Sequence, residues 1–462
     1  MKKEQSEKSL KEKSRDYSIK DGIFSTIKDS IAGNFISPFA IALNSSNSMI
    51  AMLSSIPGLL GPISQWQSAD LIEKYPRKKI VLTAVLFEIL SWIPIIAIAL
   101  LYYFQILTGI LPLMTLIFFS LYVICANASA PAWFSWIGDL VDEEHRGRWF
   151  AKRTFILGTV SLISAILCAV LLDFLKKNNL LIIGFIILFI ITLISKVISR
   201  YYLSKQYEPQ LTFKKENYFS FFQFVKKAPF NNFGRFTIFR AMLNLSTAIA
   251  GPFFTIYMLR ELNFSYLTYI IILSAATLFQ LITIKAWGRF SDKYGNYQIF
   301  RITIALIALC PIAWLFSKSP IYLIIVPQLL SGIGWGGFNF ACSNYVFDCV
   351  TPQKRCLAFS YYELLNGIGI FIGAAIGAML IEKIKTDILH PILIIFIISG
   401  VLRLLVGIIM IPRIKEVKIK ERFSTKKQIG RIAKKIESPI IKEIHYIHTI
   451  INPKFYLNSK QT

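Results

Sequence analysis

Long apolar runs constrain the fold of this sequence more than any other feature. A membrane-spanning helix needs about 20 predominantly apolar residues, and twelve such runs follow one another along the 462 residues. They lie at about 22–43, 48–66, 79–103, 108–132, 154–174, 179–202, 236–259, 265–286, 297–317, 320–345, 356–381 and 388–412. Hydrophobic residues make up 55% of the chain, above the roughly 45–50% of a soluble domain. The sequence therefore predicts an all-α integral membrane protein with twelve transmembrane helices and argues against a soluble enzyme.

Basic residues are distributed unevenly over the connections between these runs. The chain has 51 Lys and Arg against 26 Asp and Glu, a net charge of +25. If the N-terminus is cytoplasmic, 42 of the basic residues fall on that side of the membrane and six on the other. Because basic loops stay in the cytoplasm, we expect both termini to be cytoplasmic in a multi-pass protein of the plasma membrane. The basic excess then indicates contact with anionic lipid, not binding of nucleic acid.

Three motifs recur between the first six and the last six runs. They are Ser37-Pro38-Phe39 with Gly251-Pro252-Phe253, Glu73-Lys74-Tyr75 with Asp292-Lys293-Tyr294, and Asp139-x-Val141-x4-Arg146 with Asp348-x-Val350-x4-Arg355. Their shared order and near-constant offset indicate a duplicated six-helix unit. Parallel repeats of this kind place a solute site between the two halves. The expected segments are a solvated cytoplasmic tail (1–21), a first half (22–202), an interfacial linker (203–235), a second half (236–412) and a basic amphipathic cytoplasmic tail (413–462).

The connection after the eighth run carries a glycine-rich, charged motif. It reads Gly288-Arg-Phe-Ser-Asp292-Lys293-Tyr294-Gly295-Asn296. This resembles the loop signature G-x-x-x-D-[RK]-x-G-[RK] of the major facilitator superfamily, with Asn296 replacing the final base. With Pro-Ala-Trp-Phe-Ser-Trp-Ile-Gly-Asp-Leu-Val at 131–141, the chain resembles uncharacterised prokaryotic members of that superfamily. The resemblance implies two pseudosymmetric six-helix halves.

The resemblance also implies a cytoplasmic gate at the signature loops. In the superfamily the signature Asp is thought to hold the cytoplasmic side closed, which assigns Asp292 and its degenerate counterpart Glu73 to that gate. The expected gate residues are Glu73, Asp139, Arg146, Gly288, Asp292, Gly295, Asp348 and Arg355. The alternative is that these charges anchor span ends at the membrane interface.

Polar residues recur every three or four positions in the first, seventh and tenth runs. Such a stripe must face protein or water, because lipid satisfies no polar group. By the resemblance, runs 1, 4, 7 and 10 line the central cavity. The predicted substrate or ion cavity comprises Asp29, Asn34, Ser37, Asn127, Arg240, Asn244, Trp335 and Asn339. The alternative, favoured for the serines and threonines, is hydrogen bonding between helices.

Charged residues within the runs are costly unless they are compensated. We expect Asp29 and Arg240 to face each other across the cavity, as an ion pair or as contacts to substrate and proton. Lys28 is expected to extend its amine to the membrane surface. Glu88 has no partner that the sequence supplies, so it is either protonated and structural or a proton site. Asp29 and Glu88 are the candidate proton sites.

These features favour a secondary transporter of a small solute that works by alternating access, with H⁺ as the predicted coupling ion. No GxxxxGK[ST] motif occurs, so nucleotide hydrolysis by that motif is excluded. The six cysteines form no CxxC pair, so we expect no disulfide and no metal site. The chain has only four His, and no His/Asp/Ser or paired-carboxylate constellation stands out, so we expect no cofactor and no enzymatic activity. The expected partners are a small-molecule substrate and membrane lipids, and the expected state is a monomer. A lipid or lysolipid flippase on the same fold is the second hypothesis, and a non-transporting membrane sensor is the third.

Overall fold

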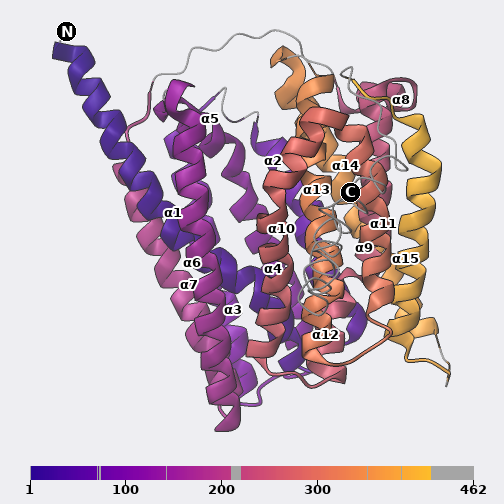
Figure 1. Cartoon of the computed structure of the whole chain (residues 1–462). Helices are drawn as coiled ribbons and strands as arrows, with labels where there is room; N and C mark the ends of the chain where they lie inside the picture. The colour runs from indigo at the N-terminus through magenta and orange to yellow at the C-terminus, as the bar shows by residue number, and fades with distance from the viewer. Residues whose placement is uncertain are drawn as a thin grey trace, which may run out of the picture.

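Helices of membrane-spanning length make up most of the computed structural model (Figure 1). It describes the backbone of residues 2–69, 71, 74–141, 143–209, 220–350, 352–384, 386 and 388–417. Side chains are described at all of these residues except 2–8, 69, 143–148, 150–151, 347 and 352–357. The first half contains α1 (Lys2–Ala42), α2 (Asn47–Ala69), α3 (Arg77–Tyr103), α4 (Leu111–Ala128), α5 (Ala130–Leu140), α6 (Glu143–Lys177) and α7 (Leu181–Lys205). The second half contains α9 (Asn232–Ile256), the π-helical turn η3 (Tyr257–Glu261), α10 (Tyr266–Tyr294), α11 (Asn296–Ala313), α12 (Pro320–Ile325), α13 (Pro327–Cys349), α14 (Pro352–Lys383), α15 (Pro391–Met410) and the 3-10 turn η4 (Ile411–Arg413). Between the halves lie α8 (Phe221–Lys227) and the 3-10 turn η2 (Ala228–Phe230).

Ten segments of the described chain are long and apolar enough to cross a membrane. The predicted first and second spans lie on α1 and α2, which are not among those ten. Lys28, Asp29 and several small polar residues lower the hydropathy of α1, and α2 is rich in Ser and Gln. The predicted all-α membrane architecture is confirmed, and the count of twelve spans stays a prediction.

The predicted N-terminal tail continues directly into the first span. α1 begins at Lys2 and runs unbroken to Ala42. Ser14, Ser18 and Asp21 are buried against the first half, whereas Glu12, Lys13, Asp16 and Lys20 are exposed, so this part of the tail is solvated on one face. At the other end, residues 418–462, most of the expected amphipathic tail, lie outside the described residues.

The fourth span of the first half is divided into two helices. α4 ends at Ala128 and α5 begins at Ala130, with Pro131 in its first turn. Proline lacks an N–H group, so it is accepted in the first turn but breaks a helix that continues through it. Ser129, between the two helices, keeps helical backbone angles (φ −77°, ψ −22°), and Leu111–Leu140 remains one segment long enough to cross a membrane.

Small residues bring α14 close to both of its neighbours. A Cβ atom on Gly369, Gly373 or Gly377 would lie within 2.4 Å of a backbone carbonyl oxygen of α9. On the other side, a Cβ on Gly367 would lie 1.8 Å from the carbonyl oxygen of Gly58 in α2. Close backbone approach of this kind drives helix association in membranes, and here it joins the two halves through α2 and α14.

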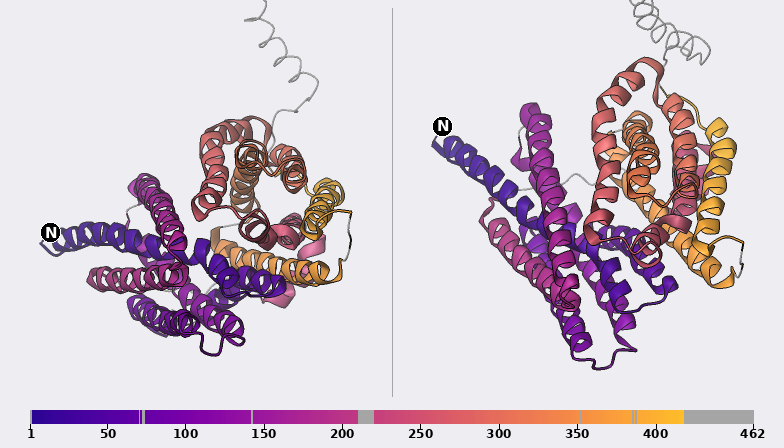
Figure 2. Two further views of the ribbon diagram at one scale, coloured as in Figure 1. Left: turned by 90° about the horizontal axis from the view of Figure 1, so that it is seen from below. Right: turned by 60° about the horizontal axis from the view of Figure 1, so that its bottom comes forward.

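Polar contacts also join the halves at the end of the bundle remote from the N-terminus. Asp173 of α6 accepts hydrogen bonds from the backbone N–H groups of Tyr266 and Leu267 at 2.8 and 2.9 Å. Arg260 of η3 donates to the side chain of Asn47 in α2. Toward the N-terminal end, α1 and α6 lean away from α10 (Figure 1), and the two groups of helices are distinct when seen from below (Figure 2). The halves thus converge at the end predicted to face the outside.

Candidate functional site

A polar cavity of about 500 Å³ lies within the first half. Its walls come from α1 through α7. Six charge-bearing side chains line it, three of each sign: Asp21, Lys28, Asp29, Glu88, Arg153 and Lys196. Hydrogen-bonding groups are added by Ser25, Thr26, Tyr122, Asn127, Ser129 and Trp133. The cavity therefore gathers six charged side chains from four helices, α1, α3, α6 and α7.

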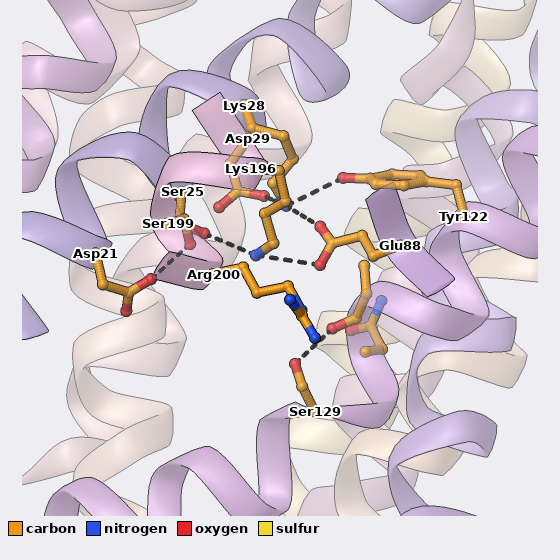
Figure 3. Close-up of polar contacts among 12 residues, drawn as sticks. Asp21, Ser25, Lys28, Asp29, Glu88, Tyr122, Ser129, Lys196, Ser199 and Arg200 are labelled. Atoms are coloured by element: carbon orange, nitrogen blue, oxygen red, sulfur yellow. Dashed lines mark hydrogen bonds and ion pairs between the residues drawn. The ribbon is translucent and has the colours of Figure 1, made fainter. Parts of the chain in front are cut away.

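Glu88 of α3 lies between two lysines from two other helices (Figure 3). Its side chain is 1% exposed. Oε1 lies 2.7 Å from Nζ of Lys28 on α1, and Oε2 lies 3.1 Å from Nζ of Lys196 on α7. Buried charges of this kind are stable only when they are paired. Glu88 thus has the partners that the sequence did not reveal, and it links three helices.

Lys28 lies inside the first half and does not extend to the surface. Its side chain is 4% exposed, and it forms a second ion pair with the neighbouring Asp29. Its Nζ also donates to the Tyr122 hydroxyl at 3.3 Å. The expected surface position of Lys28 is wrong, because Glu88 and Asp29 stabilise its charge within the bundle. Asp29 is 60% exposed and lines the cavity.

Lys196 is the main residue of this site that sequence reasoning missed. The charge distribution assigned it to the cytoplasmic connection, but it is buried within α7. Its Nζ also donates to Ser25 at 3.3 Å, and on the same helix Ser199 donates to Asp21 at 2.6 Å. Thr192, Lys196 and Ser199 are spaced at i, i+4 and i+7, which places them on one face of a helix. That polar stripe is the signal that could have identified Lys196.

Arg153 of α6 occupies a different part of the cavity wall. Its guanidinium lies over the Trp133 ring, 4.8 Å from the ring centroid. Among the described residues it forms no ion pair, and its buried Nε has no hydrogen-bond partner. Gly22 of α1 leaves room for it, since a Cβ there would lie 2.8 Å from Nη2.

Arg240 of α9 does not pair with Asp29 in this conformation. Its guanidinium lies 5.6 and 4.9 Å from the ring centroids of Trp335 and Phe338, and its Nη1 contacts Cys342 Sγ at 3.8 Å. Asp29 pairs with Lys28 in the first half. The expected ion pair across the cavity is therefore not formed here, because each charge has partners within its own half.

The remaining predicted cavity residues are distributed over both halves. Asn127 lines the cavity and accepts from Gln65 at 3.0 Å. Five others are not among the lining residues of this cavity: Asn34, Ser37, Asn244, Trp335 and Asn339. Ser37 lies 3.1 Å from Ser54 of α2, oxygen to oxygen. This contact is the helix-to-helix hydrogen bonding that was the alternative interpretation.

The predicted gate residues lie within separate networks in the two halves. In the first half, Arg77 pairs with Asp139 at 2.6 Å. At the equivalent place in the second half, Asn296 donates to Asp348 at 3.3 Å. Gly288 and Asp292 both lie near the end of α10, and Asp292 is exposed. Glu73 lies outside the described residues, as do the side chains of Arg146 and Arg355.

Gly295 ends α10 in a backbone conformation that requires glycine. Its φ angle is +86°, which side chains with a Cβ rarely adopt. A Cβ there would also lie within 2.8 Å of the Glu416 carboxylate, which accepts from the Tyr297 N–H at 2.8 Å. The expected tight turn is therefore present, and it packs against the chain that follows α15.

Each half holds the chain that leaves its sixth span in a matching way. Trp136 Nε1 donates to the Tyr207 carbonyl at 2.8 Å, and Tyr345 donates from its hydroxyl to the Lys415 carbonyl at 2.6 Å. Trp136 and Tyr345 occupy equivalent positions in α5 and α13, three residues before Asp139 and Asp348. This repeated contact was not visible in the sequence motifs, because an aromatic side chain in a span has many possible roles.

Comparison with known proteins agrees with this architecture. The uncharacterized MFS-type transporter YfiU of Bacillus subtilis (strain 168) is 27% identical over 107 residues, which are 23% of this chain and 20% of YfiU. The riboflavin transporter RibZ of Clostridioides difficile (strain 630) is 30% identical over 90 residues, which are 19% of this chain and 20% of RibZ. The chain thus spans about a fifth of the length of these curated relatives. A mutant of the nucleoside transporter NupG has the same fold, with a TM-score of 0.68 at 13% identity over 88% of this chain and 100% of that chain.

The family model provides the assignment. The model described as Major Facilitator Superfamily matches twice, at residues 22–244 and 236–451. The two matches correspond to the two helical halves, and together they cover most of the chain. This multi-pass membrane protein, a transporter by its family, therefore belongs to the Major Facilitator Superfamily.

Proposed function

We propose that this transporter carries a small solute by alternating access and couples that movement to H⁺. The observation that supports the proposal best is Glu88, a carboxylate buried in a solute-sized cavity between Lys28 and Lys196. Two lysines stabilise the ionised form of this carboxylate, so its affinity for a proton changes when either lysine moves away from it. Glu88 is the proposed proton site. Asp29 lines the cavity and pairs with Lys28.

Protonation of Glu88 has a defined structural consequence. The carboxylate links α3 to α1 and to α7. A neutral carboxyl loses both ion pairs, so the three helices are held together less strongly and the two lysines need another counter-charge. The change in helix packing is the proposed route by which proton binding alters the access of the cavity.

Alternating access also requires the halves to separate at the end where they now converge. Two polar contacts would then break: Asp173 would lose the first turn of α10, and Arg260 would lose Asn47. The gate residues at the other end would then approach one another. Asp139 and Asp348, each held within its own half, are proposed to keep the gate surfaces in position.

Solute counterflow in proteoliposomes tests this function. A thermal-shift screen of purified protein against sugars, amino acids, organic acids, nucleosides and amphiphiles first supplies the solute. We expect an imposed pH gradient to accelerate uptake of that solute by the unaltered protein. The double variant Asp29→Asn with Glu88→Gln leaves Lys28 and Lys196 without a counter-charge, so its folding is first checked by thermal unfolding in detergent. The folded variant should retain exchange but lose this acceleration. Glu363→Gln, a half-buried carboxylate of α14 that does not line the cavity, is the control. Equal pH dependence in the double variant would exclude H⁺ coupling through these residues.

Assays on the same proteoliposomes distinguish the proposed function from the alternative functions. A lipid or lysolipid flippase would scramble labelled lipid between leaflets without solute counterflow, and a membrane sensor would do neither. Light scattering in detergent tests the proposed monomer, and fractionation of cells tests the proposed plasma-membrane location.

A further inference from the structure

The cavity contains one cation, Arg153, that forms no ion pair with the described residues, although Asp21 of the same cavity interacts with it electrostatically. Lys28 and Lys196 both pair with Glu88, whereas Arg153 forms no ion pair among the described residues. Its Nε is buried without a hydrogen-bond acceptor, and its guanidinium lies over the Trp133 ring. A buried donor without an acceptor is costly. A ligand that brings acceptors to this place would remove that cost.

The position of the guanidinium is set by the local backbone. A Cβ on Gly22 would lie 2.8 Å from Arg153 Nη2 and 3.1 Å from Leu157. The absence of a side chain at Gly22 therefore allows Arg153 to lie between α1 and Trp133. Contact with the face of an indole ring restricts the position of a guanidinium, and a guanidinium held in place suits the two oxygens of a carboxylate.

The charges that line the cavity indicate the charge of the ligand. Three basic and three acidic side chains line it, so it is neutral when all six are ionised. Glu88 pairs with Lys28 and Lys196, and Lys28 in turn donates a hydrogen bond to Tyr122. Cys125 of α4 also interacts electrostatically with Glu88, and Asp29, Asp21 and Arg153 line the same cavity. One proton on Glu88 leaves a net charge of +1, which is unfavourable away from water. A ligand with a single negative charge restores neutrality, and a dianion does not.

We infer that the cavity binds an organic monocarboxylate, held by Arg153, together with one proton on Glu88. This inference rests on the proposed function and specifies its substrate class. Val81, Val85 and Phe119 provide an apolar wall for the body of the solute. The volume of about 500 Å³ lies in the range that small-molecule sites occupy. A lipid phosphodiester carries the same single charge, so the test includes it.

Binding of matched carboxylates and amides to the purified full-length protein tests the inference. The probes are benzoate with benzamide, nicotinate with nicotinamide, and octanoate with octanamide, titrated at pH 6 and pH 8. We expect at least one acid to bind about tenfold more tightly than its amide, as for charge-assisted hydrogen bonds. It should also bind more tightly at pH 6, because a proton on Glu88 leaves the positive charge that the anion neutralises. No preference for any acid over its amide would overturn the inference.

Variants at Arg153 connect that preference to the residue. Arg153→Gln should abolish the preference for the acid and leave binding of the amide unchanged. Arg153→Lys and Gly22→Ala keep the charge but change its position, and each should reduce the preference. Arg200→Gln, an arginine of α7 that does not line the cavity, is the control and should retain it. If Arg153→Gln does not fold, the other two variants decide, and an unchanged preference in both overturns the inference.

The outcomes separate this inference from the proposed function. Counterflow of a neutral solute that Arg153→Gln leaves intact would overturn the substrate class but not the transporter. Scrambling of an anionic phospholipid that Arg153→Gln abolishes, without solute counterflow, would overturn the proposed function itself.

Discussion

Asp173 at the end of α6 caps the first turn of α10, a helix of the other half. The carboxylate oxygens accept hydrogen bonds from the N–H groups of Tyr266 and Leu267, at 2.8 and 2.9 Å. A negative charge at a helix N-terminus is favoured by unpaired N–H groups and by the helix dipole. Because α6 and α10 belong to different halves, this interaction stabilises the conformation in which that end of the protein is closed.

Asp173→Asn should shift the protein toward conformations that are open at this end. Loss of the charge removes about 1 kcal/mol of helix-terminus interaction, which corresponds to a roughly fivefold change in the equilibrium. Spin labels in the connections at 178–180 and 317–319 would report the change as a population with longer distances. Lys177→Gln alters a charge in the same helix turn without touching α10 and should leave the distances as they are. An unchanged distribution for Asp173→Asn would show that this contact does not control closure.

Glu88→Leu should destabilise the protein strongly, and a second substitution should restore part of the loss. The single change leaves Lys196 buried without a counter-charge, at a cost of about 3–5 kcal/mol. Lys196→Met in addition removes that charge, while Lys28 keeps its pair with Asp29. Thermal unfolding in detergent should show the largest fall in Tm for Glu88→Leu and a smaller fall for the double variant. If the fall in Tm for the double variant equals the sum of the falls for Glu88→Leu alone and Lys196→Met alone, Glu88 and Lys196 do not interact energetically.

Gly367→Ala should disturb the contact between α2 and α14. The new Cβ would lie 1.8 Å from the carbonyl oxygen of Gly58, so the helices must separate. We expect a cost of about 1–3 kcal/mol, as for overpacking, seen as a lower Tm. Gly158→Ala is the matched control, because a Cβ on that helical glycine would have no neighbouring atom within 4 Å. A Tm for Gly367→Ala equal to that of the control would show that the helices accommodate the methyl group.

Arg77→Gln should cost more stability than Asn296→Ala, although the two residues occupy equivalent positions. Arg77 is buried, pairs with Asp139 and donates to the Pro209 carbonyl at 2.8 Å. Hydrogen bonds to charged groups contribute about 1.5–3 kcal/mol each, against about 1 kcal/mol for neutral ones. Lys79→Gln, an exposed neighbour, should leave the Tm unchanged. The reverse order of the Tm losses would contradict this interpretation of the two networks.

The fold could be predicted from the sequence because lipid imposes a simple rule. A backbone in hydrocarbon must satisfy its own hydrogen bonds, so runs such as 79–103 and 388–412 form helices in almost any context. The duplication was visible because Asp139 and Asp348 keep the same spacing to their neighbours in both halves. Gly369, Gly373 and Gly377 are spaced four residues apart, which places them on one face of a helix, and that face packs against α9.

The candidate site was only partly predictable. Asp29, Glu88 and Asn127 were identified and line the cavity. Arg240 was expected opposite Asp29, but it lies against Trp335 and Phe338 in its own half. A charge within a span indicates that a partner exists, but its helical position does not indicate which of the other helices carries that partner.

The sequence by itself determined that this chain crosses the membrane repeatedly, in two related halves, with charged residues that cannot face lipid. Local periodicity and the cost of exposing polar groups to hydrocarbon suffice for these conclusions. Only the tertiary structure decided that Lys28 and Lys196 enclose Glu88 and that Arg153 lies over Trp133. These relationships join helices far apart in the chain, and packing of all the helices together sets their distances.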